Sequence, residues 1–131
     1  MYSNKEIIQR LYQFFKQKDF DQLRLLLSET IRWEQMKGFP NGGIHTGREQ
    51  VISHVLAGFD TNWEEWKAVV EEFIEAGDSV LVTGYYEGRY RNTGKYMKAD
   101  FLHLYKLASG QVTSFKQYTD TFEIYAATQR G

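Results

Sequence analysis

His103 is the residue in this sequence best suited to acid–base chemistry. It lies in the segment DFLHLYKL, where alternation places it on one face with Phe101 and Tyr105, while Leu102 and Leu104 point to the other face. Imidazole changes charge near neutral pH, so a histidine in a pocket is a candidate general acid or base. A strand histidine among aromatic residues can equally be structural, with one tautomer held by hydrogen bonds. The sequence leaves both interpretations open.

The closing segment GQVTSFKQYTDT supplies polar residues that could join His103. Alternation predicts one face with Phe115, Gln117 and Thr119 and another with Lys116, Tyr118 and Asp120. A two-residue loop in the preceding turn, ASGQ, sets His103 opposite Lys116. A loop longer by one residue, with Gly110 left-handed in a bulge, sets it opposite Gln117. Asp120 is a candidate catalytic acid at the pocket mouth, and alternatively the cap of the tail that follows.

The composition is that of a globular protein, and we predict a single domain over residues 1–131. Aromatic residues make up 16% of the chain, and they commonly line small-molecule pockets, although strands also favour them. The net charge of −1 provides no field that would attract nucleic acid or anionic lipid. No apolar run approaches the about 20 residues that span a bilayer. We therefore expect a cytoplasmic protein that binds neither nucleic acid nor membrane.

The histidines give little reason to expect a metal. His45, His54 and His103 share no short ligand spacing, and the chain has no cysteine, which also excludes disulfides and thiol chemistry. The segment GFPNGG lacks the lysine and the strand–helix context of a phosphate-binding loop. We expect no metal ion and no cofactor.

Helical periodicity comes first along the chain. Ser3 and Glu6 form a capping box at the start of SNKEIIQRLYQFFKQK, whose apolar residues recur at helical spacing. The segment DFDQLRLLLSET predicts a shorter second helix, with Asp19 or Asp21 as its cap and Leu27 on its apolar face. Two helices therefore precede the first strand.

The period then changes to two. TIRWEQM predicts a strand with Trp33 and Gln35 on one side and Glu34 on the other. The segment KGFPNGGIHTG is rich in glycine and holds the only proline, so we predict a loop. Thr46 and Glu49 make a second capping box, which predicts a third helix that follows this loop.

The third helix is expected to end near Asp60, and the remaining chain reads as sheet. Its β-rich runs are broken at AGD, RNTGK and ASGQ, which predicts four long strands in an antiparallel meander. This order of elements predicts an α+β fold, in which a curved antiparallel or mixed sheet wraps around about three helices from the N-terminal half. A cone of this kind encloses a pocket unless side chains fill it.

The opening helix pair, GGIHTGREQV before the third helix, NTGKYMKADFLHLYKL and GQVTSFKQYTDT together resemble the nuclear transport factor 2-like superfamily, in particular its SnoaL-like, ketosteroid-isomerase-related branch. The resemblance covers nearly the whole chain. It implies a cone-shaped α+β barrel, a ligand cavity between sheet and helices, and a homodimer formed through the sheet. The family includes isomerases, polyketide cyclases, dehydratases, epoxide hydrolases and proteins that only bind, so the fold alone does not select a reaction.

The resemblance also suggests roles for individual residues. The similar cyclases carry a catalytic histidine and an acid on the last two strands, which favours the register with His103 opposite Gln117. An amide cannot take up a proton at neutral pH, so Gln117 puts cyclase chemistry by that route in doubt. Glu34 falls about where the ketosteroid isomerases carry their base, with Tyr12 or Tyr118 as donor. The alternative is that Glu34 faces outward.

Three functions follow from these residues. The leading hypothesis is an isomerase, cyclase or hydratase that acts by acid–base chemistry on a small apolar or amphipathic molecule. The alternatives are a module that binds a ligand without chemistry, and an assembly domain whose cone is filled by its own side chains. The predicted catalytic residues are His103, Asp120, Tyr118 and Glu34. The predicted pocket residues are Tyr12, Phe15, Trp33, Gln35, Phe59, Trp63, Tyr86, Phe101, Phe115 and Gln117.

Overall fold

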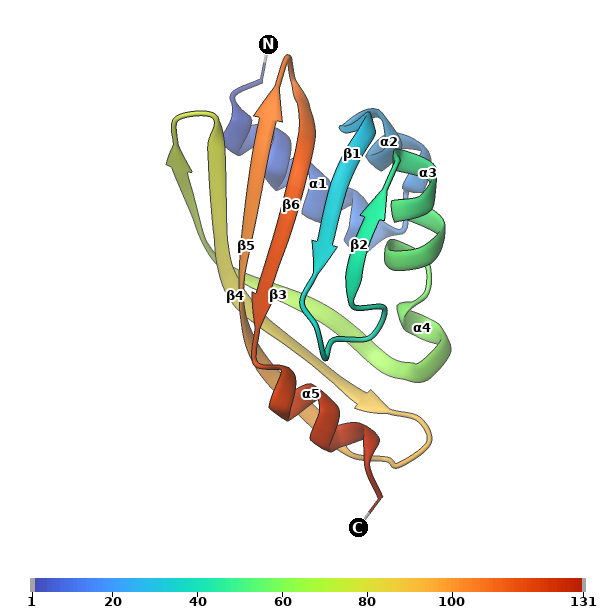
Figure 1. Ribbon diagram of the computed structural model, residues 1–131. Coiled ribbons are helices and arrows are strands. Elements are labelled where there is room, and N and C mark those ends of the chain that lie inside the picture. Colours follow the sequence, from blue (N-terminus) through green and yellow to red (C-terminus); the bar gives the residue numbers. More distant parts are fainter. Residues whose placement is uncertain (1, 131) are drawn as a thin grey trace.

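The computed structural model of the chain describes residues 2–130 (Figure 1). In chain order the elements are α1 (Asn4–Gln17), α2 (Phe20–Leu25), β1 (Leu27–Gln35), β2 (Gly43–Thr46), α3 (Arg48–Val51), the π-helix η1 (Ile52–Leu56), α4 (Phe59–Asn62), β3 (Trp63–Ala76), β4 (Ser79–Tyr90), β5 (Tyr96–Ala108), β6 (Gln111–Thr119) and α5 (Thr121–Thr128). The strands form one six-stranded sheet in the order β2-β1-β6-β5-β4-β3.

The sheet is mixed, curved and not closed. β1 runs parallel to β6, and the other neighbouring strands are antiparallel. Among the described residues β2 and β3 do not pair with each other, so the sheet forms an open cone (Figure 1). Helix α1 contacts β3 and β4, α3 contacts β1 and β2, and α5 contacts β5. The predicted α+β class and the antiparallel meander of β3 to β6 are confirmed.

Burial alternates along the central strands and defines two faces. In β5 every second residue from Met97 to Leu107 is buried, because these side chains face the helices. We call this the inner face of the sheet. Leu102 and Leu104, which lie between them, are only half-buried and belong to the outer face. The inner face therefore carries the core and any site enclosed by the cone.

The first two helices begin where the sequence predicts. Ser3 Oγ accepts a hydrogen bond from the Glu6 N–H (3.1 Å), and Glu6 Oε1 accepts one from the Ser3 N–H (2.9 Å), which completes the capping box. Asp19 Oδ1 accepts a hydrogen bond from the Gln22 N–H (3.2 Å) at the start of α2. Local capping chemistry is sufficient to set these two helix starts.

The predicted end of the second helix is wrong. Helix α2 ends at Leu25, and Leu27 is the first residue of β1 rather than part of a helical apolar face. Leu27 is fully buried and pairs with Val112 of β6. Leu27 continues the helical spacing of Leu23 by only one turn. Its burial and its pairing with a strand distant in the sequence override this weak helical preference.

The loop and third helix also differ from the prediction. Gly43–Thr46 is the edge strand β2, which pairs with β1 from Arg32 to Gln35. Thr46 is therefore held in a strand and cannot cap a helix. Gly47, with φ of 95°, precedes α3, and no side-chain cap is present. The predicted helix divides into α3, the π-helix η1 and α4.

The chain does not end in a strand. Residues after Thr119 form α5, whose first turn is capped by Asp120: its Oδ1 accepts a hydrogen bond from the Glu123 N–H (3.3 Å). The prediction that β-rich sequence continues to the end is therefore wrong. Ile124 and Ala127 form the buried face of α5. Burial of this face stabilises the helix despite its β-branched and aromatic residues.

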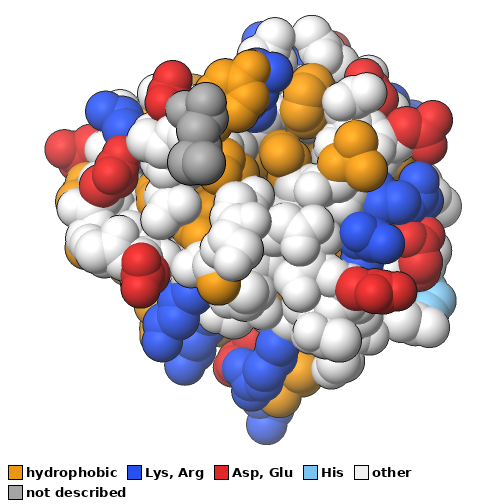
Figure 2. All heavy atoms as spheres, turned by 90° about the horizontal axis from the view of Figure 1, so that it is seen from above, with side chains coloured by type: hydrophobic (Ala, Val, Ile, Leu, Met, Phe, Trp, Pro, Cys, Tyr) orange, Lys and Arg blue, Asp and Glu red, His pale blue; other side chains and the backbone are white. Residues whose placement is uncertain are grey.

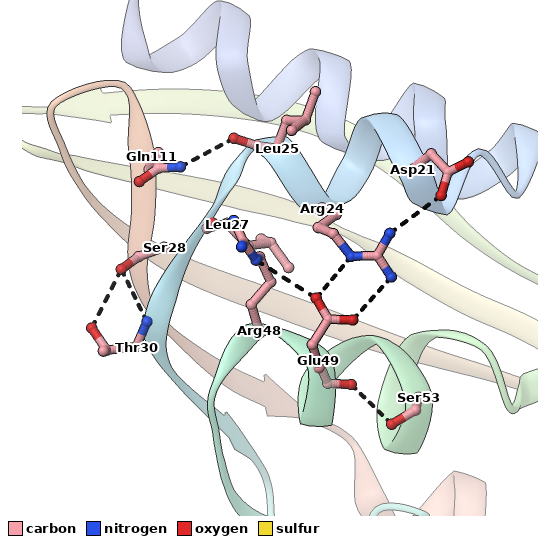
Figure 3. Close-up of polar contacts among 10 residues, drawn as sticks. All are labelled: Asp21, Arg24, Leu25, Leu27, Ser28, Thr30, Arg48, Glu49, Ser53 and Gln111. Carbon is pink, nitrogen blue, oxygen red and sulfur yellow. Dashed lines mark hydrogen bonds and ion pairs between the residues drawn. The ribbon is translucent and has the colours of Figure 1, made fainter.

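A polar cluster ties α2 to α3 beside the start of β1 (Figure 3). Arg24 binds the Glu49 carboxylate in a bidentate arrangement, with Nε–Oε2 and Nη2–Oε1 distances of 2.8 and 3.0 Å. Arg24 also reaches Asp21 (3.2 Å), and Arg48 donates to the Leu27 carbonyl (3.5 Å). Glu49, predicted to close a capping box, thus holds two helices together instead.

Figure 2 shows the end of the molecule that carries the N-terminus. The described acidic and basic side chains lie among one another on this face rather than in separate blocks, with hydrophobic side chains between them. Such an arrangement gives no extended field of one sign on that face. No helix among residues 2–130 combines the length and the apolar character that crossing a bilayer requires.

Candidate ligand-binding site

The pairing of β5 with β6 sets the polar partners of His103. Gln117 lies opposite His103, as the preferred register predicts. The longer turn expected with that register is wrong, however, because the turn is the two-residue loop Ser109–Gly110, with φ values of 52° and 79°. The extra residue is Thr113, which stands unpaired in a bulge further along β6, and its Oγ1 donates to the Lys106 carbonyl (3.1 Å).

His103 is buried on the inner face, with both ring nitrogens occupied by tyrosine hydroxyls. Tyr12 of α1 meets Nδ1, and Tyr86 of β4 meets Nε2. The ring of Phe101 is stacked on the imidazole, with the ring centroids 3.9 Å apart. His103 is only 4% exposed, and its position is therefore defined on both sides by hydrogen bonds and on one face by an aromatic ring.

The hydrogen bonds continue beyond the two tyrosines. Tyr105 Oη–H donates to Tyr12 Oη (2.8 Å), and Gln117 Nε2–H donates to Tyr86 Oη (2.8 Å). Gln117 Oε1 accepts a hydrogen bond from the N–H of Met36 (3.0 Å), just after β1. These contacts form a continuous chain, Tyr105–Tyr12–His103–Tyr86–Gln117, which we call the buried polar chain. It joins α1, β4, β5 and β6 inside the cone.

Every titratable group in the buried polar chain is neutral at pH 7. Burial lowers the pKa of His103 to about 3, because the imidazolium would lose its hydration. Burial likewise raises the pKa of Tyr12, Tyr86 and Tyr105 above the ordinary tyrosine value. An amide at position 117 fits this environment, since it makes both of its hydrogen bonds without introducing a charge.

The buried polar chain holds one more hydrogen than its own contacts use. Tyr105, Tyr12, His103 and Tyr86 carry three hydroxyl hydrogens and one imidazole hydrogen, but only three contacts join these four side chains. Because Tyr105 donates to Tyr12 and Gln117 donates to Tyr86, the hydrogen left over belongs to Tyr12 or Tyr86, depending on the imidazole tautomer. The chain can therefore donate one hydrogen bond to another molecule.

Two adjoining cavities lie next to this donor. A small inner cavity of ≈ 40 Å³ is bordered by Tyr12, Tyr86 and His103, and an open cleft of ≈ 890 Å³ lies outside it. Both cavities are lined by Tyr12, Phe15, Leu56, Phe59, Trp66 and Ala68. Tyr12 is half-buried and borders both cavities, whereas Tyr86 borders only the inner one, so Tyr12 is the donor residue that lies nearer to the cleft.

Stacked aromatic rings stand between the cleft and the inner cavity. Phe59 is stacked on Trp66 with centroids 4.6 Å apart, and Phe15 meets Phe59 edge-on at 6.2 Å. Trp66 is stacked in turn on Tyr86 at 5.0 Å. A planar ligand can take the place of one ring in a stack of this kind and keep most of the contact area. We call Phe15, Phe59 and Trp66 the aromatic wall.

Irregular backbone positions two residues that line both cavities, Leu56 and Trp66. The π-helix η1 supplies Leu56, and a π-helix turn is often found at functional sites. In a regular strand, Trp63 and Trp66 would point to opposite faces, because they are three positions apart. The register of β3 shifts between Glu64 and Lys67, with Glu65 at φ of 55°, and the two tryptophan rings approach to 5.2 Å.

Most of the predicted pocket residues surround these cavities. The inner cavity is lined by Tyr12, Phe15, Trp33, Gln35, Phe59, Tyr86 and Phe115, together with His103. Trp63, Phe101 and Gln117 are buried but do not line either cavity. Gln117 acts through its hydrogen bond to Tyr86, and Phe101 through its stacking on His103.

The other three predicted catalytic residues lie apart from His103. Glu34 is on the outer face and pairs with Arg32 (3.2 Å). Tyr118 is also on the outer face, 38% exposed, and Asp120 caps α5. None of the three lines either cavity. The structure therefore brings only His103 of the predicted catalytic set to the site.

Several site residues were missed by the sequence analysis. These are Leu11, Val55, Leu56, Trp66, Ala68 and Tyr105. Tyr105 shares the alternating face of His103, so its presence could have been found from the pattern alone. Trp66 could not, because the backbone irregularity in β3 has no clear sequence signal. Within residues 2–130, no three His, Asp or Glu side chains gather as a metal-binding group.

Comparison with known proteins identifies the family. The family model described as SnoaL-like domain matches residues 8–115. A nuclear transport factor 2-like protein from Burkholderia thailandensis E264 is 26% identical, over 98% of this chain and 99% of that chain, with a TM-score of 0.94. A similar protein of unknown function from Burkholderia pseudomallei K96243 is 25% identical, over 96% and 98% of the two chains, with a TM-score of 0.86.

A protein from Jannaschia sp. CCS1, proposed to be a SnoaL-like polyketide cyclase, shares the fold. It is 23% identical over 93% of this chain and 88% of that chain, with a TM-score of 0.79. No curated protein matches this chain. The extent of the family match and the shared cone establish that the chain belongs to the SnoaL-like domain family, with the nuclear transport factor 2-like fold.

Proposed function

We propose that this protein binds a small, largely apolar aromatic molecule that carries a hydrogen-bond acceptor such as a carbonyl oxygen. The observation that carries the proposal is the buried polar chain, which has one hydrogen to donate beside an aromatic-walled cavity. The aromatic wall would contact the ring system of the ligand, and Tyr12 would donate to its acceptor. A cleft of ≈ 890 Å³ has the size typical of small-molecule sites.

The electrostatics favour binding over catalysis. A general acid or base works best with a pKa near the operating pH, whereas burial places the pKa of His103 at about 3 and raises the pKa of the tyrosines. Asp60 is the one carboxylate among the residues that line the two cavities, and it is exposed and paired with Lys18. Gln117 contributes an amide where chemistry of the cyclase type would require an acid.

An acid–base enzyme is the second candidate, and one feature favours it. The hydrogens of Tyr86, His103 and Tyr12 can shift along the chain, which would deliver a proton to a ligand at Tyr12 and leave a tyrosinate at Tyr86. The Gln117 amide would donate to that tyrosinate. The raised pKa of Tyr86 opposes the shift, so this route requires a ligand that is itself strongly basic in the transition state.

The proposal is tested with a matched pair of neutral ligands, 2-acetylnaphthalene and 2-ethylnaphthalene. They differ in the carbonyl acceptor and are similar in shape. We expect the ketone to bind about fivefold more tightly, which corresponds to one net hydrogen bond. Tyr12→Phe should abolish this difference and leave the hydrocarbon affinity unchanged. If neither compound binds at solubility-limited concentration, the proposal is wrong.

Hydrogen exchange separates the two candidates. Incubation of 2-acetylnaphthalene with the protein in D2O reports proton transfer at its methyl group. A binding protein leaves the exchange rate equal to that in buffer. An enzyme accelerates it, and the acceleration disappears in Tyr12→Phe. Acceleration of this kind would replace the binding proposal by the second candidate.

We also propose that the protein forms a homodimer through the outer face of its sheet. This face exposes Ile74 (41%) and Tyr118 (38%), and carries half-buried Leu81, Leu102 and Leu104. Apolar side chains from neighbouring strands that remain partly exposed are typical of an interaction surface. A second copy would bury them and leave the inner face of each subunit to its own ligand.

A further inference from the structure

The mouth of the cleft carries charges that the binding of a neutral ligand does not use. Three lysines and one aspartate line it, namely Lys16, Lys18, Lys67 and Asp60. Lys18 pairs with Asp60, and Lys67 pairs with Glu87 (3.1 Å). Among residues 2–130, no Asp or Glu carboxylate lies within ion-pair distance of the Lys16 ammonium group.

The Lys18–Asp60 pair connects the two sides of the mouth. Lys18 is the left-handed residue that ends α1, with φ of 57°, and Asp60 belongs to the short α4. Asp60 directly follows Phe59 of the aromatic wall, so the ion pair holds the segment whose ring separates the cleft from the inner cavity. The carbonyl of Asp60 also accepts a hydrogen bond from Arg91 Nε (3.2 Å).

We infer that the ligand is an amphipathic anion, an aromatic carboxylate, whose carboxylate takes the place of Asp60 at Lys18. This inference rests on the proposed binding function and specifies its ligand class. The ligand carboxylate pairs with Lys18 and with the free ammonium of Lys16, while the aromatic part lies against the aromatic wall. Asp60 is released by the exchange, and Phe59 next to it can then move aside and join the cleft to the inner cavity.

The exposure of the ion pair makes this exchange feasible. The side chains of Lys18 and Asp60 are 65% and 56% exposed, and ion pairs between such exposed side chains contribute little to stability. A ligand carboxylate offers Lys18 an equivalent partner. The ligand in addition buries its ring system and neutralises Lys16, neither of which Asp60 can do. The surplus of positive charge at the mouth also favours the approach of an anion.

The test compares 2-naphthoate with 2-acetylnaphthalene, which has a similar shape and a carbonyl acceptor but no charge. We expect the wild-type protein to bind the naphthoate about fivefold more tightly at low ionic strength, with the advantage lost in 0.5 M salt. The double variant Lys16→Gln, Lys18→Gln should lose the preference for the naphthoate, because neither ammonium group remains to pair with its carboxylate.

Asp60→Asn tests whether Asp60 competes with the ligand carboxylate for Lys18. It removes the carboxylate that pairs with Lys18. The affinity for the naphthoate should therefore rise about threefold, and by more than the affinity for the ketone. Asp78→Asn makes the same charge change in the turn between β3 and β4, away from the residues that line the cleft, and should alter neither affinity.

The outcomes separate this inference from the proposed function. If the two compounds bind equally to the wild-type protein, or if Asp60→Asn and Asp78→Asn have the same effect, the ligand class inferred here is wrong and the neutral binding site remains. If neither compound binds, the proposed function fails, and this inference fails with it.

Discussion

Gln117 and His103 face each other across β5 and β6, and both side chains are buried. Tyr86 lies between them in the hydrogen-bond chain, because its hydroxyl meets both Gln117 Nε2 and His103 Nε2. The charge that His103 can carry therefore depends on which side chain stands at position 117. With an amide there, nothing offsets the desolvation that lowers the pKa of His103 to about 3.

The first prediction concerns acid stability. The unfolded chain binds a proton on His103 near the ordinary pKa of about 6.5, whereas the folded protein binds it only near 3. His103 therefore costs the fold no stability above about pH 6.5, and stability is lost as the pH falls from there toward 3, by up to about 1.4 kcal/mol per pH unit. Urea unfolding at several pH values across this range should show that the free energy of unfolding changes less with pH for His103→Gln than for wild type.

The control for this pH dependence is His54→Gln, which removes an exposed histidine from η1 and should leave it unchanged. A wild-type stability that does not change between pH 6.5 and 4 would contradict the burial of a neutral imidazole.

The second prediction restores an acid to the chain. In Gln117→Glu a carboxylate next to Tyr86 would attract the imidazolium, so the pKa of His103 should rise from about 3 toward neutrality. The free energy of unfolding should fall by about 1–3 kcal/mol, because a carboxylate cannot donate the hydrogen bond that the Gln117 amide donates to the Tyr86 hydroxyl. NMR titration of the imidazole measures the pKa. Gln111→Glu, at the far end of β6, should leave it unchanged; an equal shift in both variants would deny the coupling.

At the scale of elements, three irregularities build the site. The bulge at Thr113 turns Gln117 toward the inner face, the shift at Glu65 turns Trp66 inward, and η1 presents Leu56 to both cavities. Each interrupts a regular ladder of hydrogen bonds at a cost in local stability, and each re-aims a side chain that the regular element would direct elsewhere. The regular parts of the same strands carry the core.

The third prediction belongs to α4, which carries Phe59 over the inner cavity. Phe59→Ala should increase the association rate of 2-acetylnaphthalene severalfold, because the ring no longer separates the cleft from the inner cavity. The free energy of unfolding should fall by about 2 kcal/mol, less than for a fully buried phenylalanine. Stopped-flow tryptophan fluorescence and urea unfolding measure the two effects.

Phe122→Ala is the matched control, since this phenylalanine of α5 is 73% exposed and lines neither cavity. It should change neither rate nor stability appreciably. An association rate that is the same in Phe59→Ala and wild type would mean that the aromatic wall is no barrier.

At the scale of the whole molecule, the curved sheet separates two surfaces that differ in burial and in the residues they carry. The inner face holds the buried polar chain and the cavities, while the outer face carries leucines that remain half-buried in one chain. A sheet with one face against helices can leave the other for a second sheet. Pairing through the outer face would not obstruct the cleft, which opens between α1, α4 and β3.

The fourth prediction tests this division. Size-exclusion chromatography with light scattering should give a dimer for wild type, and Leu104→Glu, on the outer face, should give a monomer that still binds 2-acetylnaphthalene. Leu25→Glu, at a leucine of α2 that is 60% exposed, should remain a dimer. A wild-type monomer, or a Leu104→Glu variant that remains dimeric, would rule out the outer face as the interface.

The sequence by itself determined those features that depend on near neighbours in the chain. The capping box of Ser3 and Glu6 was predictable because its hydrogen bonds span three residues, and the shared face of Phe101, His103 and Tyr105 because alternation is a property of any strand. The four-strand meander was predictable for the same reason, from short turns between β-rich runs.

Only the tertiary structure decided the surroundings of His103. Tyr12 lies 91 residues away in the chain, and it meets the imidazole because α1 crosses the inner face of a curved sheet. The bulge at Thr113 and the irregularity at Glu65 shift the register between paired strands, and no local pattern of residue types encodes them. The chemistry of the site, a neutral imidazole between two tyrosines of which one has a hydrogen bond to donate, follows from burial and from these distant contacts, which exist only once the cone has formed.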